Sequence, residues 1–442
     1  MTLVTVVIGI GILLILIMSK VKPFLALLIT SFLVGCRLQY VLAQEKNVEA
    51  IRLTLLSIGK GFYDTITQMA FVVMLGALLG KIIESSGAAT RITQTLTDWV
   101  GVKNLPWAMM LTGFIIGIPL FYNAGFVLLV PLVFSLARTS QIPLLLLAIP
   151  MASALSVTHG FLPPHPAPTA IAYLFQADIG LTLLYGLVLA VPTVILAGPL
   201  FSRTLATISV NNFSVPHVHQ AKEPGTRVSF LLALLPVFII TFGALASLIL
   251  PKGQISTIIA ILTRSEIALL LAVILSLWLL VFRQGFTRKQ FTSWAWGSQK
   301  EILMILLVIA AGGSFKQVLI DGQVGAAILE KTSHLKLNPL LMGWLIAALL
   351  RVSLGSATVA ALTAGGMVIP MVEGGLASRE LMVLAVGSGS LMFSHINDTG
   401  FWMFKEYFNL TLAQTFRSWS LMETIVSVMG LLGVLTLSQW VH

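Results

Sequence analysis

The sequence predicts an all-α polytopic membrane protein, and its composition, the length of its apolar runs and the placement of its charges support this prediction. Of the 442 residues, 57% are hydrophobic and 10% are charged, whereas about 25% of the residues in a soluble domain are charged. Apolar runs of about 18 residues or more, the length of a membrane-crossing helix, recur along the chain. The net charge of +10 comes from cations between these runs, where they set orientation in the membrane.

The first apolar run, residues 3–18, is expected to be a retained helix rather than a signal peptide. No basic residue precedes it, and Lys20 and Lys22 follow it. Because Lys and Arg collect in cytoplasmic loops, these lysines place the N-terminus outside. Further spans are expected at 24–42, at 69–79 with its neighbours, and at 181–200, 230–250 and 267–282. The single cysteine, Cys36, lies in an apolar run, so the chain has no disulfide framework.

Residues 203–227 form the longest polar stretch and divide the chain into two halves, 1–202 and 228–442. This stretch carries the cations Arg203, Lys222 and Arg227 and the histidines His217 and His219. The cations predict a cytoplasmic linker, and the histidines of such a tether are expected to bind nothing. The first helix of the second half then runs outward, whereas that of the first half runs inward. Both termini are therefore expected outside, and related halves would be inverted repeats.

A constant spacing indicates that the two halves are related. Counting 233 residues onward from Pro106 gives Pro339, and the same offset leads from Asn123 to Ser356, from Asp178 to Thr411 and from Thr182 to Thr415. Segments 76–89 and 311–327 also correspond, because each passes from glycine-rich apolar residues through a lysine and an acid to a turn of small residues. Inverted repeats are typical of secondary transporters, whose sites lie at the repeat interface near the membrane midplane.

Each half also holds two interruptions of its apolar runs. One run in each half is broken and too long for a single span, which predicts re-entrant hairpins at about 105–137 and about 339–372. One crossing in each half is broken, by THGFLPPHP within about 144–175 and by SHINDTG within about 381–408. Non-helical backbone survives at membrane depth only beside protein or a water-lined cavity. The four breaks are therefore expected to surround one substrate cavity.

The segments around these breaks resemble the gluconate permease family of bacterial proton symporters. The matching segments are LFYNAGFVLLVPLVF (120–134), ALSVTHGFLPPHPAPTAIA (154–172), GGSFKQVLID (312–321), RVSLGSATVAALTAGG (351–366) and SHINDTGFWMFKEYFNLT (394–411). They stand in the family's order, and the resemblance extends from Val21 to the C-terminus. It implies a multi-pass protein of the bacterial cytoplasmic (inner) membrane that imports gluconate or a related sugar acid with protons, is not an enzyme and uses no cofactor. Similarity to the wider ion-transporter group further implies homodimers and an elevator-type mechanism, in which a mobile part carrying the hairpins moves against a scaffold.

Two features depart from the family pattern. Many members have an acid at the position of Asn123, in a word resembling FYEVGF, and the family is usually glycine-rich where this chain has YDTITQ (63–68). A coupling role assigned to that acid does not transfer to this chain, and substrate preference is left open for the same reason. D-serine or another small hydroxy acid is the alternative substrate, and sodium is the alternative coupling ion.

The candidate substrate-binding residues lie in the four interruptions. A sugar acid needs positive potential for its carboxylate, which helix N-termini supply, and donors and acceptors for its hydroxyls. Small residues let the backbone approach a carboxylate, and an imidazole can bind a hydroxyl or an anion. The predicted residues are Tyr122, Asn123, Gly125, Thr158, His159, His165, Gly355, Ser356, Thr358 and Asn397. Helix packing and closure of the broken turns are the alternative roles of these residues.

Asp398, with His395 beside it, is the candidate for ion coupling. An acid inside a bilayer is costly unless it is paired or hydrated, which makes it a functional candidate. We expect its carboxyl to be buried and unpaired, or to cap the helix that follows. Arg351 is expected to pair with the substrate carboxylate or with an acid such as Asp398.

Two other classes of function, a channel and an intramembrane enzyme, compete with a secondary transporter. A channel lined by the broken helices, or an intramembrane enzyme using His159, His165 and Asp398, is the competing hypothesis. A primary pump is disfavoured because the sequence has no GxxxxGKS/T phosphate loop. A metal site is not expected, because the sequence has no HExxH motif and no cysteine cluster.

Overall fold

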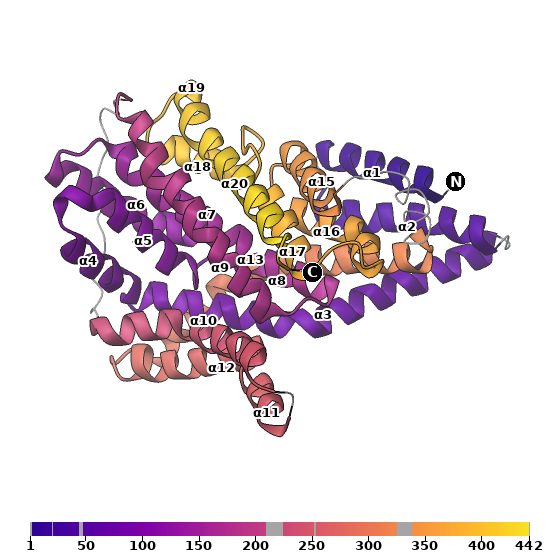
Figure 1. Ribbon diagram of the computed structural model, residues 1–442, viewed down its shortest axis with the longest axis horizontal. Helices are drawn as coiled ribbons and strands as arrows, with labels where there is room; N and C mark the ends of the chain where they lie inside the picture. The colour runs from indigo at the N-terminus through magenta and orange to yellow at the C-terminus, as the bar shows by residue number, and fades with distance from the viewer. Residues whose placement is uncertain are drawn as a thin grey trace.

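The chain folds into an all-helical membrane protein (Figure 1). A computed structural model describes residues 2–19, 21–43, 47–208, 224–251, 253–324 and 338–441. Within these ranges there is no strand, and nine helices are long and apolar enough to cross a bilayer. The number rises to ten if the bent pair Ala88–Val100 and Val102–Gly117 in the described part forms one span. The prediction of an all-α polytopic membrane protein is confirmed.

The first half of the chain supplies helices α1 to α9. They are α1 (Thr2–Met18), α2 (Pro23–Ala43), α3 (Asn47–Ser85), α4 (Ala88–Val100), α5 (Leu105–Gly117), α6 (Tyr122–Ser140), α7 (Leu144–Phe161), α8 (Pro166–Phe175) and α9 (Ile179–Ile195). A π-helical turn, Leu196–Leu200, continues α9.

The second half supplies the remaining helices. They are α10 (Thr226–Ile249), α11 (Gln254–Leu262), α12 (Ser265–Ser276), α13 (Arg288–Asp321), α15 (Pro339–Leu354), α16 (Ala357–Glu373), α17 (Arg379–Gly389), α18 (Thr399–Tyr407), α19 (Leu412–Thr415) and α20 (Leu421–Leu437). A π-helical turn, Phe416–Ser420, joins α19 to α20. Both halves thus repeat one order: a long helix (α3, α13), a pair joined by a short turn (α5–α6, α15–α16), a pair joined by an irregular segment (α7–α8, α17–α18) and a final helix with a π-helical turn.

Local sequence explains where the corresponding helices begin. Pro106 and Pro339 lie in the first turns of α5 and α15, where a missing N–H leaves no hydrogen bond unmade. The side chain of Asp178 accepts from Leu181 N at 2.8 Å and caps α9. The side chain of Thr411 caps α19 in the same way through Gln414 N at 3.2 Å. Positions related by the offset of 233 residues therefore start corresponding helices.

The two long helices, α3 and α13, cross at glycines. A Cβ at Gly61 would lie 2.8 Å from the carbonyl carbon of Gly313, closer than real Cβ contacts, so a side chain there would force the backbones apart. Small residues permit this close packing of membrane helices. Near the crossing, Ser314 Oγ donates to Ile58 O at 3.0 Å, and Ser57 Oγ donates to Asp321 at 2.6 Å. In Figure 1, α3 runs along the length of the molecule, and α2, α12 and α13 pack against it.

The interruptions of the helices fall in or beside the predicted segments. The turns between α5 and α6 and between α15 and α16 occupy residues 118–121 and 355–356, and the irregular segment between α17 and α18 occupies 390–398. The segment between α7 and α8 is shorter than predicted, because residues 158–161 remain helical and only 162–165 do not. Leu162 is extended, as expected for a residue that precedes a proline.

Only the two ends of the predicted linker, 203–227, are described. A 3-10 turn, Arg203–Leu205, follows the first half, and α10 begins at Thr226. Residues 209–223, with Lys222, His217 and His219, lie outside the described residues.

The α3–α13 crossing predicts a position-specific effect of a single methyl group. We expect Gly61→Ala to lower the free energy of unfolding by about 1–3 kcal/mol, the usual cost of overpacking. The matched control is Gly59→Ala on the same helix, where a Cβ meets no atom within 4 Å. Thermal melting of both purified variants in detergent measures the difference, and equal melting temperatures would contradict the role assigned to this crossing.

Candidate functional site

One cavity of about 520 Å³ lies where the two hairpin turns and the irregular segment 390–398 meet. Its volume falls in the range of about 300–1,000 Å³ that is typical of small-molecule sites. The polar residues that line it are Tyr122, Asn123, Ser156, His159, Arg351, Ser356, Thr358, Asp398, Thr399 and Glu423. Apolar side chains, including Phe121, Met304, Leu391 and Trp419, complete the lining.

Three helices begin at this cavity. Tyr122 and Asn123 open α6, Thr358 lies in the first turn of α16, and Thr399 opens α18. The first turn of a helix carries N–H groups without intrahelical partners and about half a positive charge. These helix starts therefore place N–H donors beside the cavity, from which an anion can accept.

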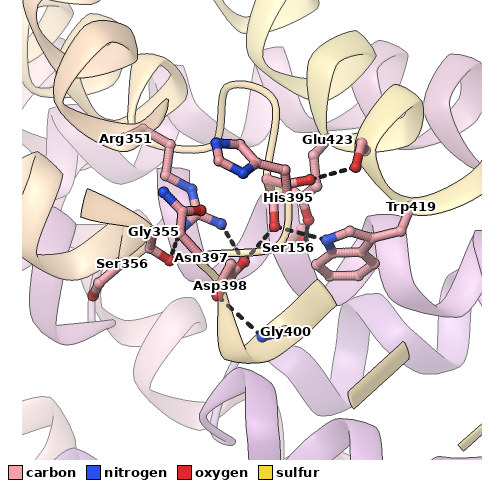
Figure 2. A network of polar contacts seen from close by, with 12 residues as sticks. Ser156, Arg351, Gly355, Ser356, His395, Asn397, Asp398, Gly400, Trp419 and Glu423 are labelled. Carbon is pink, nitrogen blue, oxygen red and sulfur yellow. Dashed lines mark hydrogen bonds and ion pairs between the residues drawn. The ribbon is translucent and has the colours of Figure 1, made fainter. Parts of the chain in front are cut away.

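A buried ion pair joins α15 to the start of α18 (Figure 2). The Arg351 guanidinium donates to an Asp398 carboxylate oxygen and to Gly355 O, and the exposed fractions of the two charged side chains are 3% and 11%. The same carboxylate oxygen accepts from Ser394 Oγ, while the other accepts from Gly400 N at 3.0 Å and caps α18. The expectation that Asp398 caps this helix is confirmed, and the expectation that it is unpaired is wrong, because the fold brings Arg351 against it.

The hairpin turn at Gly355 is held against the segment 390–398. Gly355 has a φ of 75°, and a Cβ there would lie 2.5 Å from the carbonyl carbon of Asn397, so this position requires glycine. Asn397 Nδ2 donates to Val352 O at 2.7 Å, and His395 Nε2 is hydrogen-bonded to the same oxygen at 2.9 Å. Gly355, Asn397 and His395 therefore hold the turn between α15 and α16 against the segment 390–398.

Several polar atoms at this cavity have no protein partner. Tyr122 Oη, His159 Nδ1, Arg351 Nε and Glu423 Oε2 are buried and make no hydrogen bond in the described part of the chain. Buried polar groups in proteins are nearly always hydrogen-bonded. All four residues line the same cavity, which makes them candidates for contacts with a polar ligand.

Gly355, Asn397 and His395 are not among the residues that line the cavity, and three further predicted residues, Gly125, Thr158 and His165, lie in helix packing. A Cβ at Gly125 would lie 2.9 Å from the Leu155 side chain, and Thr158 Oγ1 donates to Leu155 O at 2.9 Å within its own helix. His165 Nε2 is hydrogen-bonded to Gly117 O, which fixes the irregular segment 162–165 against α5. The expectation that all four breaks surround the cavity is therefore wrong for this segment, although His159, which the structure places inside α7, does line it.

Glu423 and Ser156 belong to the site but are absent from the predicted residues. Glu423 Oε1 accepts from Ser156 Oγ, and this contact joins α20 to α7 across 267 residues of sequence. Trp419, also in the lining, donates to Ser394 Oγ at 2.7 Å. The available signal was Glu423 itself, an acid within the apolar run of the last helix, since intramembrane acids are functional candidates.

The chain is similar over its whole length to known transport proteins. A family model described as GntP family permease matches residues 1–441. The high-affinity gluconate transporter of Escherichia coli K12 is 46% identical over 445 residues, which cover 99% of this chain and 100% of the relative. The Gnt-II system L-idonate transporter of the same organism is 43% identical, with 100% of both chains covered, and the gluconate permease of Bacillus subtilis 168 is 41% identical, with 99% of each covered.

Solved structures of transporters share the fold at low sequence identity. The YdaH transporter of Alcanivorax borkumensis gives a TM-score of 0.67 with 15% identity and covers 95% of this chain and 98% of its own. The MtrF protein of Neisseria gonorrhoeae gives a TM-score of 0.57 with 15% identity and covers 87% of this chain and 83% of its own. The family match and the close relatives confirm the resemblance found in the sequence: this chain belongs to the GntP family of permeases and is a membrane transport protein, not an enzyme.

Proposed function

We propose that this permease is a secondary active transporter that imports gluconate, or a closely related sugar acid, together with protons. The observation that carries the proposal is the cavity in which the buried, unpartnered polar atoms of Tyr122, His159, Arg351 and Glu423 meet. The printed names of the relatives, gluconate transporter and L-idonate transporter, support the same substrate class.

The cavity provides separate chemistry for the two parts of a sugar acid. The first turns of α6 and α16 and the free Nε–H of Arg351 are donors for the carboxylate. Tyr122, Asn123, His159, Ser356 and Thr358 offer donors and acceptors for hydroxyls. This density of polar groups favours a polyol anion over an apolar or lipid-like substrate. In this proposal Asp398 positions Arg351 rather than carrying the coupled proton, because donors already surround its carboxylate.

The proposed architecture is a pair of inverted repeats, 1–202 and 228–442, joined by a cytoplasmic linker. The repeated order of helices and the matching helix starts at Asp178 and Thr411 support it. Asn123 and Ser356, which the offset of 233 residues relates, line the same cavity from two different hairpins. We further propose an elevator-type homodimer in the bacterial cytoplasmic membrane with both termini outside, in line with the orientation of the lysines and arginines.

Transport of gluconate is tested directly in proteoliposomes that contain the purified protein. We expect labelled gluconate to exchange against unlabelled gluconate, and to accumulate under an inward proton gradient. A channel would not show counterflow, and D-serine in place of gluconate tests the alternative substrate. Accumulation that follows a sodium gradient alone would contradict proton coupling, and absence of gluconate exchange would contradict the substrate.

Substrate binding beside the turn between α15 and α16 is tested by placing a bulkier side chain at Thr358. Thr358→Leu is expected to abolish gluconate uptake while the protein stays folded, because the added bulk blocks access to the N-terminus of α16. Ser353→Leu is the matched control, since Ser353 is exposed on the neighbouring arm and its hydroxyl donates only to Leu349 O of its own helix. Normal uptake by Thr358→Leu would exclude substrate from this part of the cavity.

The Arg351–Asp398 pair is tested by neutralising the acid. A hydrogen bond to a charged group contributes about 1.5–3 kcal/mol, so Asp398→Asn is expected to weaken gluconate binding by about 10- to 100-fold through a misplaced guanidinium. Titration calorimetry in detergent gives the Kd. Glu406→Gln, at an exposed acid on α18 that pairs with Lys405, serves as control. An unchanged Kd for Asp398→Asn would contradict the positioning role.

A further inference from the structure

Glu423 is an acid without a counter-ion at the wall of the substrate cavity. It is the third residue of α20, directly after the π-helical turn, and its exposed fraction is 1%. Its Oε1 accepts from Ser156 Oγ, while its Oε2 has no hydrogen-bond partner in the described part of the chain. Figure 2 shows its carboxyl close to Ser156, on the side of Trp419 and away from the end of the Arg351 side chain that reaches Asp398.

The charged and titratable groups that share the cavity with Glu423 come from several elements. They are Tyr122 of α6, His159 of α7, Arg351 of α15 and Asp398 of the segment before α18. Arg351 is the single lysine or arginine among the described lining residues, and its ion pair is with Asp398. Glu423 therefore has one neutral donor, Ser156, and no cation of its own.

The cavity holds two acids and one arginine, so it lacks the positive charge that would balance an entering anion. With the substrate carboxylate bound, three carboxyl groups would share one guanidinium, and an unpaired buried carboxylate is strongly unfavourable. A proton on one of the two acids removes this conflict. Asp398 accepts from Arg351, Ser394 and Gly400, which are all donors that suit an ionised carboxylate. Glu423 has one carboxylate oxygen without a hydrogen-bond partner among the described residues. It can therefore take the proton while Asp398 keeps all three of its hydrogen bonds.

We propose that Glu423 carries the proton that enters with the sugar acid, an inference that rests on the proton symport proposed above. A proton from external water binds the Glu423 carboxylate and makes it a neutral carboxylic acid, which allows the substrate carboxylate to approach Arg351. When the cavity opens to the cytoplasm, the sugar acid leaves and the O–H of Glu423 passes its proton to water. In the empty cavity the ionised Glu423 takes the place of the substrate as the second carboxylate that shares the cavity with Arg351. Anion binding and proton binding are thereby linked, because the substrate carboxylate and the Glu423 carboxylate depend on the same Arg351 guanidinium for positive charge.

The test uses the full chain in proteoliposomes and three measurements: gluconate exchange at equal pH, accumulation under an inward proton gradient, and gluconate-dependent proton entry reported by a trapped pH dye. Glu423→Gln is expected to retain exchange, because a neutral amide resembles the protonated acid. It is expected to lose both accumulation and proton entry, because the amide cannot release a proton. Glu406→Gln, the exposed acid control, should match the wild type in all three.

Outcomes that overturn the proposal differ from those that overturn gluconate transport. Proton-driven accumulation by Glu423→Gln would refute the role of Glu423 while leaving symport intact, and so would loss of exchange in a folded Glu423→Gln protein that still binds gluconate. If Glu423→Gln does not fold, Glu423→Asp decides: it should keep gluconate-dependent proton entry with a pH profile that differs from the wild type. An unchanged profile would then refute the assignment. Wild-type protein that moves gluconate without protons would instead refute the proposed symport.

Discussion

The buried ion pair between Arg351 and Asp398 is the contact on which the cavity depends. Arg351 belongs to the first arm of a hairpin, and Asp398 ends the irregular segment that leads into α18, so the pair fixes two breaks against each other. Leaving one member of such a pair uncompensated costs about 3–5 kcal/mol. Arg351 also donates to Gly355 O in the hairpin turn, and Asp398 also caps α18 through Gly400 N, so the pair links the turn before α16 to the start of α18.

The membrane imposes a second constraint, because the bilayer core offers no water to unwound backbone. At this site side chains take the place of water as hydrogen-bond partners of the backbone. Asn397 and His395 bind Val352 O, and Ser420 Oγ donates to Ser394 O. Side chains of the protein thus satisfy these two carbonyl groups, while Tyr122 Oη, His159 Nδ1, Arg351 Nε and Glu423 Oε2 are buried without a hydrogen-bond partner in the described part of the chain.

Much of the fold and the family could be predicted from the sequence, because both leave local traces. Apolar runs long enough to cross the bilayer indicate the helices, and prolines, glycines and short polar segments indicate where the helices are interrupted. The site was predicted in part: Tyr122, Asn123, His159, Ser356 and Thr358 line the cavity as expected. These residues lie at or near helix starts and interruptions, where a local pattern already shows that the chain departs from simple helix packing.

The sequence by itself therefore determined a polytopic helical transporter with interrupted helices and named its family. The tertiary structure alone decided which groups meet. It pairs Asp398 with Arg351 instead of leaving it free, turns His165 toward α5, and brings Glu423 to Ser156 across 267 residues of sequence. The physical reason is that a local pattern reports whether a segment suits the bilayer, whereas the partner of a buried polar group depends on which helix faces pack together, and no spacing within one segment records that.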